Sequence, residues 1–283
     1  MKRVWIRVKE DLPHSDRVMA VLKPALEKQG LLVTTTKELP VQMPDLCLCL
    51  GGDGTLLSTV RALGAFRYEV PILGIHTSSG LGFLHSLSIP QGPLEPWATD
   101  LSMALGTGAF SEEQRWGLTA HVEGSPSEEL WALNDVVISK GPLSRMIYLR
   151  LRVGDSVLFQ RMRGDGLIIS SATGSTAYSL SAGGPVVQPT LKTLLIVPIC
   201  PHEVAQRPVV LDGSSPLCVE MLEHKVQSHL TCDGQVNVDI AAGQNVIVQR
   251  AARPLRWVLF RGEAVRSNYY FESLKSKLRY GGE

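Results

Sequence analysis

Residues 45–66 constrain the fold of this chain more than any other segment. In the run at residues 45–50 every residue after Asp45 is apolar, the turn GGDGT follows at residues 51–55, and apolar residues then recur at helical spacing up to residue 66. A strand that is apolar on both faces is typical of a parallel sheet, because helices cover both faces of such a sheet. The order strand, glycine turn, helix therefore predicts an α/β fold with a parallel sheet.

The rest of the first third of the chain continues this alternation. Residues 4–8 are apolar with period two, residues 15–29 carry apolar side chains at helical spacing, and residues 31–33 and 72–75 are short apolar runs. We therefore expect residues 1–112 to form an α/β domain in which helices flank a parallel sheet.

The pattern changes at about residue 113. Short strand-like runs follow one another, and the runs at residues 146–153 and 156–161 flank Gly154 and Asp155, which predicts a tight hairpin. Similar runs continue as far as Trp257–Phe260. We expect an all-β, sandwich-like domain over residues 113–265. The last segment, residues 266–283, has one apolar stripe and predicts an amphipathic helix.

Composition excludes several classes of protein. The net charge of +1 gives no general attraction to nucleic acid or to an anionic membrane. Charged residues at positions 2, 3, 7 and 9–11 leave no apolar stretch for a signal peptide, and no apolar run approaches the ~20 residues of a membrane span. We expect a cytoplasmic protein without nucleic-acid or membrane partners, whose five scattered cysteines are free core thiols.

The turn GGDGT carries the first chemical signal. Gly51, Gly52 and Gly54 allow backbone N–H groups to approach phosphate oxygens, and Thr55 opens a helix whose N-terminus favours anions. A tight turn that needs glycine only for steric reasons would look similar. The carboxylate of Asp53 favours function, since it would repel a phosphate unless it orients an attacking hydroxyl, accepts its proton or holds a metal. No Walker lysine is present, so we expect Mg²⁺ to neutralise phosphate charge.

A second signal is the stretch from Asp165 to Pro185. Seven of the eleven residues from Ser171 to Ser181 carry hydroxyl groups, and Tyr178 stands among them. A polar loop before a helix would also produce this pattern. The functional interpretation is a recognition loop, in which hydroxyls and amides contact ribose and pyrophosphate and the tyrosine ring stacks on a base.

Together the two stretches resemble the NAD kinase family, as do the segments GFL at 82–84, LNDVVI at 133–138 and DGQ at 233–235. The resemblance covers nearly the whole chain. It implies transfer of a phosphoryl group from ATP or polyphosphate, with a divalent metal such as Mg²⁺, to the 2′-hydroxyl of the adenosine ribose of NAD. It also implies a homo-oligomer, a dimer or a tetramer, and a last helix that returns to complete the N-terminal domain.

The resemblance further implies roles for single residues. Asp53 would be the catalytic carboxylate, Asn134 and Asp135 would bind ribose hydroxyls, and Tyr178 would lie against the adenine. No residue of the chain is singled out as a metal ligand. The other positions that match NAD-binding positions of the family, some of them facing a neighbouring subunit, are Phe83, Arg145, Arg163, Asp165, Thr173, Thr176, Ala177, Ser181 and Gln235.

Three departures accompany the resemblance. Asp135 stands where the family usually has Glu, His76 stands where Asn is usual, and Ser171-Ala172 replaces Thr-Pro. Two alternatives stay open at this point. A lipid kinase can also carry a GGDGT-like turn, but it would require an apolar acceptor groove. A sensor that binds NAD(H) or NADP(H) without catalysis would show no metal-dependent turnover.

Overall fold

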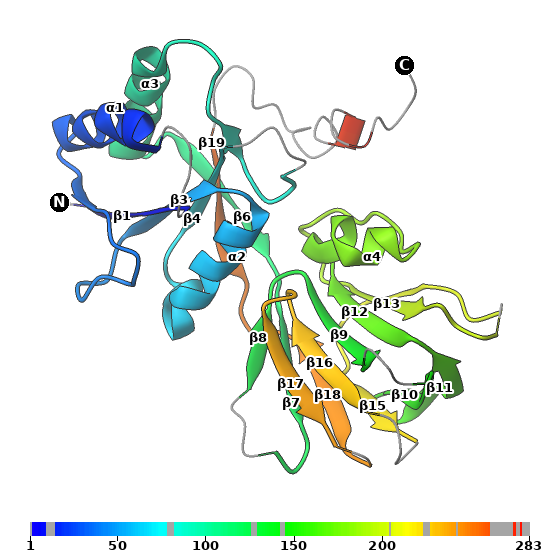
Figure 1. Ribbon diagram of the computed structural model, residues 1–283. Coiled ribbons are helices and arrows are strands. Elements are labelled where there is room, and N and C mark those ends of the chain that lie inside the picture. Colours follow the sequence, from blue (N-terminus) through cyan, green and yellow to red (C-terminus); the bar gives the residue numbers. More distant parts are fainter. Residues whose placement is uncertain are drawn as a thin grey trace. The chain divides into compact units, whose positions relative to one another are not determined.

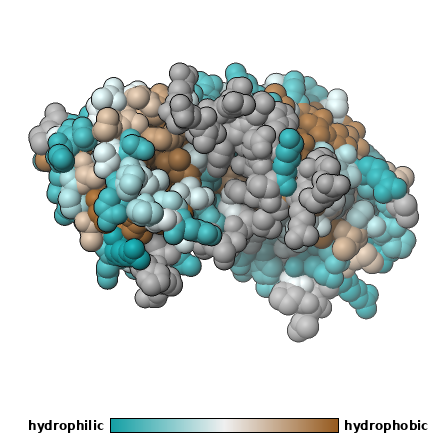
Figure 2. Space-filling model, turned by 90° about the horizontal axis from the view of Figure 1, so that it is seen from above, coloured by the Kyte–Doolittle hydropathy of each residue, from teal (hydrophilic) through white to brown (hydrophobic). Residues whose placement is uncertain are grey.

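The computed structural model describes residues 2–9, 15–77, 82–125, 129–141, 145–203, 205–222, 227–241, 243–260, 274–275 and 278. The chain divides into two compact units (Figure 1). The first comprises Met1–Gln114 with Leu255–Glu283, and the second comprises Arg115–Pro254. On the face seen in Figure 2, hydrophilic and hydrophobic residues are interspersed, as is usual at protein surfaces.

The first unit is built on a parallel sheet. Its strands run in the order β2-β1-β3-β4-β19-β6, and β5 also pairs with β4. All of the pairs among β1 to β5, and the pair of β19 with β4, are parallel. The strands are β1 (Arg3–Val8), β2 (Leu32–Thr34), β3 (Leu46–Gly51), β4 (Ile72–His76), β5 (Leu87–Ser88), β6 (Phe110–Arg115) and β19 (Leu255–Phe260).

Helices cover both faces of this sheet. Helices α1 (Ser15–Lys28) and α3 (Leu94–Thr107) lie side by side, and their apolar residues share one core with alternate residues of the strands (Figure 1). Helix α2 (Asp53–Ala62) packs on β3, where Thr59 Oγ1 lies 3.4 Å from Cys49 Sγ. The short 3-10 helix η1 (Gly64–Tyr68) follows α2. These observations confirm the α/β fold expected from the sequence.

Strand β19 corrects one expectation. The run Trp257–Phe260 was expected in the all-β domain, but β19 pairs in parallel with β4, where Trp257 lies opposite Ile72. Both Trp257 and Val258, whose side chains point to opposite faces, are fully buried. Burial on both faces is what a strand inside a helix-covered parallel sheet requires, and this explains why so apolar a run belongs there.

The second unit is an antiparallel sandwich. One sheet has the order β11-β10-β15-β18-β7-β8 and the other β14-β13-β12-β9-β16-β17, and one apolar core gathers residues of both. The strands are β7 (Leu118–Val122), β8 (Leu130–Ala132), β9 (Asp135–Lys140), β10 (Ile147–Val153), β11 (Ser156–Gly164), β12 (Gly166–Ser171), β13 (Leu194–Ile199), β14 (Val209–Leu211), β15 (Leu217–Met221), β16 (Ser228–Cys232), β17 (Val236–Ile240) and β18 (Asn245–Arg250). The all-β domain and its hairpin between β10 and β11 are thereby confirmed.

Two smaller expectations have mixed outcomes. The five cysteines form no disulfide, but only Cys47, Cys49 and Cys232 are buried, whereas Cys218 is half-buried and Cys200 is exposed. In the last segment Leu274, Lys275 and Leu278 are helical and Leu274 is buried. The rest of the expected C-terminal helix lies outside the described residues, so its return to the first unit stays a prediction. No helix in the described part of the chain is long and apolar enough to cross a membrane.

Candidate functional site

The glycine turn at the carboxyl end of β3 is sterically required. Strand β3 ends at Gly51 and helix α2 begins at Asp53. A Cβ atom on Gly51 would lie 2.6 Å from Cβ of Thr55, whose N–H donates to the carbonyl of Gly52 at 3.0 Å. Only glycine at position 51 therefore lets the helix start this close to the strand. The N-terminus of α2 therefore lies at the strand end, and the partial positive charge of a helix N-terminus favours an anion there.

The carboxylate of Asp53 is held by the segment that precedes β5. The backbone N–H of Phe83 donates to Oδ2 at 3.0 Å and that of Leu84 donates to Oδ1 at 3.2 Å. Nδ1 of His85 lies 3.0 Å from Oδ1. Burial alone would raise the pKa of Asp53, but the His85 contact and the two backbone hydrogen bonds outweigh it, so this pKa lies below its usual value. Asp53 is thus ionised and oriented.

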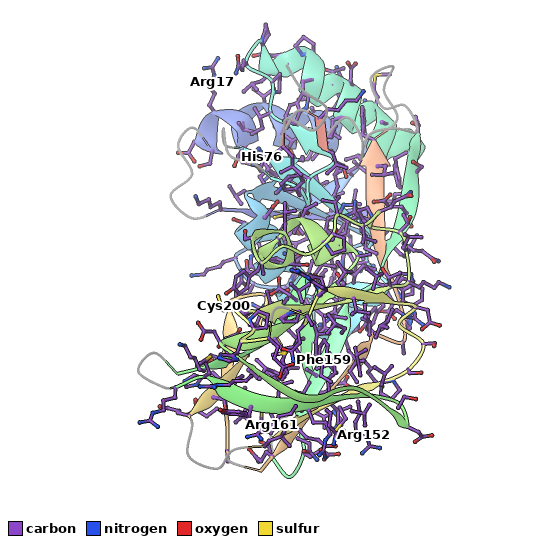
Figure 3. The ribbon with its side chains drawn as sticks, turned by 90° about the vertical axis from the view of Figure 1, so that its right-hand side faces the viewer. Arg17, His76, Arg152, Phe159, Arg161 and Cys200 are labelled. Carbon is purple, nitrogen blue, oxygen red and sulfur yellow. The ribbon has the colours of Figure 1, made fainter. Side chains whose placement is uncertain are left out.

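The segment that grips Asp53 is itself anchored to the sheet. Ser86 donates its N–H to the carbonyl of Gly74 at 3.1 Å and its hydroxyl to the carbonyl of Val258 at 2.7 Å. His76 lies inside the first unit (Figure 3). Its ring centroid lies 5.0 Å from that of His85. Sequence reasoning missed His85. No signal in the sequence pointed to it beyond a polar residue following the apolar pair Phe83-Leu84.

A basic cavity opens beside the start of α2. Its volume is about 380 Å³, and it is lined by Arg7, Val8, Lys9, Lys37, Gly54, Thr55 and Ser58. Nη1 of Arg7 donates to the carbonyl of Ser58 at 2.8 Å, which ties the guanidinium to α2. The positive charges of Arg7, Lys9 and Lys37 therefore lie next to a helix N-terminus, and both features favour an anion such as phosphate. Sequence reasoning missed these cations because they are far from the GGDGT motif along the chain.

In the second unit, Asp233 fixes the bend at Leu133 and Asn134 and the start of β9 at Asp135. Asp233 lies in the turn between β16 and β17 with a φ of 52°. Its carboxylate accepts the backbone N–H groups of Leu133 at 2.9 Å, Asn134 at 2.7 Å and Asp135 at 3.2 Å. Oδ1 of Asn134 is buried without a hydrogen-bond partner among the described residues. A buried acceptor of this kind is costly unless a ligand completes it.

Asp135 has the most strongly shifted carboxyl group of this site. Its side chain is buried, and burial together with the neighbouring charge of Asp233 raises the pKa of Asp135 to about 7, against a hydrogen bond from the backbone N–H of Tyr178. A perturbed carboxyl group in a cavity is a common property of ligand-binding sites.

The hydroxyl-rich stretch packs directly on Asn134. It forms the 3-10 helix η2 (Thr173–Thr176) and the short helix α4 (Tyr178–Ser181). A Cβ atom on Gly174 would lie 2.1 Å from the carbonyl oxygen of Asn134, so only glycine permits this approach. Ser171 joins the two segments, because its hydroxyl donates to the carbonyl of Leu133 at 2.6 Å and accepts the N–H of Gly174 at 3.1 Å.

These residues enclose a cavity of about 310 Å³. It is lined by Asn134, Asp135, Val137, Ala177, Tyr178, Thr231, Asp233 and Gly234. The structure thus brings four of the sequence-predicted residues of this unit together, namely Asn134, Asp135, Ala177 and Tyr178. The side chain of Tyr178 is half exposed, which leaves its ring accessible to a planar group.

The remaining predicted residues of this unit lie elsewhere. Arg145 and Gln235 are exposed, and Asp165 pairs with Lys140 at 2.8 Å. The guanidinium carbon of Arg163 lies 5.4 Å from the centroid of the Tyr148 ring. None of these four lines the 310 Å³ cavity, nor do Thr173, Thr176 and Ser181, which lie on η2 and α4. The structure therefore does not gather all of the predicted dinucleotide contacts into one cavity.

Comparisons with known proteins agree with this geometry. The family described as ATP-NAD kinase C-terminal domain matches residues 133–260. An NAD kinase of Geobacter sulfurreducens is 39% identical over 99% of both chains, and one of Clostridium perfringens is 36% identical over 83% of this chain and 80% of its own. The crystal structure of an Archaeoglobus fulgidus NAD kinase in complex with ATP is 26% identical, covers 98% of both chains and superposes with a TM-score of 0.75. Yeast NADH kinase shares the fold, with a TM-score of 0.84 at 22% identity.

Proposed function

The chain belongs to the NAD kinase family and is a phosphotransferase that makes NADP from NAD, and we propose that Asp53 is its catalytic carboxylate. The observation that carries this assignment is that a second segment, residues 83–85, holds the carboxylate of Asp53 at the start of α2. Two backbone N–H groups and His85 fix its carboxylate at the strand end where phosphate is expected. A carboxylate that served only to cap the helix would not need this second segment.

The reaction is an in-line phosphoryl transfer. The 2′-oxygen of the adenosine ribose forms a bond to the terminal phosphorus of ATP, the bond between that phosphorus and ADP breaks, and the hydroxyl proton passes to Asp53. The lowered pKa makes Asp53 a weak base for an alcohol. Proton transfer is therefore late, after most of the new bond has formed. Asp53 contributes chiefly by orienting the hydroxyl.

For the phosphoryl donor we propose the basic cavity. Arg7, Lys9 and Lys37 supply positive charge, and Gly54 and Thr55 bring the N-terminus of α2. The complex of the Archaeoglobus relative with ATP supports ATP as the donor. Among the described residues no cluster of three His, Cys, Asp or Glu side chains could hold a metal. Mg²⁺ commonly binds through substrate phosphates with few protein ligands, so it fits here as an ion carried on ATP that neutralises phosphate charge.

For NAD we propose the 310 Å³ cavity of the second unit. The unpartnered Oδ1 of Asn134 and the carboxylate of Asp135 are acceptors for ribose hydroxyls, and the exposed ring of Tyr178 can stack on the adenine. The shorter side chain of Asp135 still reaches this cavity. Phe83, beside Asp53, is a further contact with the base. The hydroxyl-rich helices support contacts of Thr173, Thr176 and Ser181 with the dinucleotide.

For Arg145, Arg163, Asp165 and Gln235 we propose contacts with NAD held by a neighbouring subunit. Their position outside the cavity supports this role. It implies a homo-oligomer, a dimer or a tetramer. Sedimentation equilibrium measures the oligomeric state, and a monomer at the concentrations at which the enzyme is active would contradict the proposal. We also propose a cytoplasmic location, which the five free thiols support.

The test of the proposed function is formation of NADP from NAD, ATP and Mg²⁺, followed with an NADP-specific dehydrogenase. We expect product from the wild type and none from Asp53→Asn, which keeps the size of the side chain but removes the charge. Asp155→Asn, in the exposed turn between β10 and β11, is the matched control and should remain active. Activity of Asp53→Asn equal to that of the control would remove Asp53 from the mechanism. Loss of NAD binding in Asp53→Asn would assign it to binding instead.

A further inference from the structure

A buried histidine, His85, lies against the catalytic carboxylate. The side chain of His85 is 1% exposed, and its Nδ1 lies 3.0 Å from Oδ1 of Asp53. Its ring lies between two glycines. A Cβ atom on Gly82 would come within 3.0 Å of Nδ1, and one on Gly74 within 3.1 Å of Cδ2. The neighbouring backbone therefore leaves little space around this imidazole, which confines its ring to a position beside Asp53.

The partners of the two carboxylate oxygens differ. Each oxygen accepts one backbone N–H, that of Leu84 at Oδ1 and that of Phe83 at Oδ2, and Oδ1 alone also has Nδ1 of His85 3.0 Å away in an electrostatic contact. Each carboxylate oxygen has about two lone-pair sites. Oδ1 is thus the oxygen that the protein engages more, and Oδ2 is the one with more room for a donor from outside.

We propose that His85 is a positioning residue for phosphoryl transfer, which engages Oδ1 of Asp53 so that Oδ2 alone meets the acceptor hydroxyl. This inference rests on the proposed role of Asp53. The 2′-hydroxyl of NAD donates to Oδ2, its oxygen bonds to the terminal phosphorus as the bond to ADP breaks, and its proton ends on Oδ2. Without His85, the hydroxyl can donate its proton to Oδ1 as well as to Oδ2. The attacking oxygen then approaches the phosphorus from more than one direction. An error of about 1 Å in such an alignment can cost about 100-fold in rate.

The surroundings show how the imidazole keeps its place. The ring of His76 is tilted by 60° against that of His85, and Ser86, the next residue, is tied to Gly74 and Val258 by backbone and hydroxyl hydrogen bonds. His85 is therefore fixed by the sheet and not by the substrate. An orientation set before the substrate arrives costs nothing during the reaction.

The experiment compares His85→Leu with His85→Asn by steady-state kinetics with NAD and ATP. Leucine fills the buried site without a donor, whereas asparagine places an N–H group the same number of bonds from Cα as Nδ1. We expect kcat of His85→Leu to fall about 100-fold with KM for NAD unchanged. His85→Asn should recover most of that loss. The control is His229→Leu, which removes another His–Asp contact, that of Nδ1 with Asp239 at 2.7 Å, and should leave kcat unchanged.

The outcomes separate this inference from the proposed function. A wild type that forms no NADP defeats the proposed function itself. If the wild type is active and Asp53→Asn is inactive, an unchanged kcat in His85→Leu overturns only the role of His85. Equal losses in the Leu and Asn variants would show a packing role and overturn it too. If His85→Leu does not fold, imidazole ¹⁵N resonances decide. The His85 Nδ1 signal should shift in Asp53→Asn, and an unmoved signal overturns the proposal.

Discussion

Asn134 and Asp233 are 99 residues apart in the sequence, yet Oδ1 of Asp233 accepts the backbone N–H of Asn134 at 2.7 Å. The same carboxylate also accepts the N–H groups of Leu133 and Asp135. One side chain from the turn between β16 and β17 thus sets the backbone that presents the acceptors proposed for ribose. The geometry of the NAD cavity depends on this contact between distant strands.

Asp233→Asn should weaken both the fold and NAD binding. Asparagine tolerates the positive φ of this position but offers one acceptor oxygen in place of two. A buried N–H left without a partner costs about 1–3 kcal/mol, so we expect urea denaturation to show a loss of that size and KM for NAD to rise. Asp212→Asn is the control, since Asp212 accepts a single backbone N–H in an exposed turn. Similar losses in both variants would contradict a special role for Asp233.

Asp135 should make the stability of the protein depend on pH. Its pKa is about 7 in the fold and about 3.9 in an unfolded chain. Because the folded pKa is the higher one, the contribution of Asp135 is fully present below about pH 4 and is lost as pH rises through about 7. Asp135→Asn, which cannot ionise, should therefore gain stability over the wild type by roughly 1–4 kcal/mol between pH 4 and pH 8. Urea denaturation midpoints of the two proteins over this range measure the gain. A stability difference between them that does not change with pH would contradict the raised pKa of Asp135.

Gly174→Ala should separate the hydroxyl-rich stretch from Asn134. The added Cβ would lie 2.1 Å from a backbone oxygen, so η2 has to move. Overpacking of this kind costs about 1–3 kcal/mol. We expect a lower melting temperature and a higher KM for NAD, with KM for ATP unchanged. Gly92→Ala, where a Cβ meets nothing within 4 Å, is the matched control. A Gly174→Ala enzyme with wild-type KM for NAD would show that this close approach does not shape the cavity.

Lys9→Gln should weaken binding of the phosphoryl donor, ATP, and leave binding of the acceptor, NAD, unchanged. Lys9 lines the basic cavity and is exposed, so its contribution to phosphate binding is modest. We expect KM for ATP to rise up to about fivefold, as for an exposed charge pair, and the effect to shrink at high salt. KM for NAD should not change. Lys28→Gln, at the end of α1, serves as the control for loss of one positive charge. A rise in KM for NAD instead would place the cavity on the acceptor side.

Much of the fold was predictable because its signals are local. Apolar residues on both faces of residues 45–50 indicated a parallel sheet, and the glycines of the turn indicated where Asp53 would lie. Strand β19 was assigned to the wrong domain because an apolar run does not reveal which sheet it joins. The contact of His85 with Asp53 and the hydrogen bonds that Asp233 accepts from residues 133–135 could not be predicted for a similar reason. Each acts through contacts between segments that only the folded chain brings together.

The position of β19 also sets an order of events during synthesis. The chain leaves the first unit at Gln114 and re-enters it at Leu255, and β19 takes its place between β4 and β6. Because the ribosome makes a protein from its N-terminus, all residues of the sandwich exist before β19 does. The domain that is begun first is therefore completed last. Until then β6 lacks the strand that joins it to β4, so the nascent enzyme has a gap in the sheet that carries Asp53.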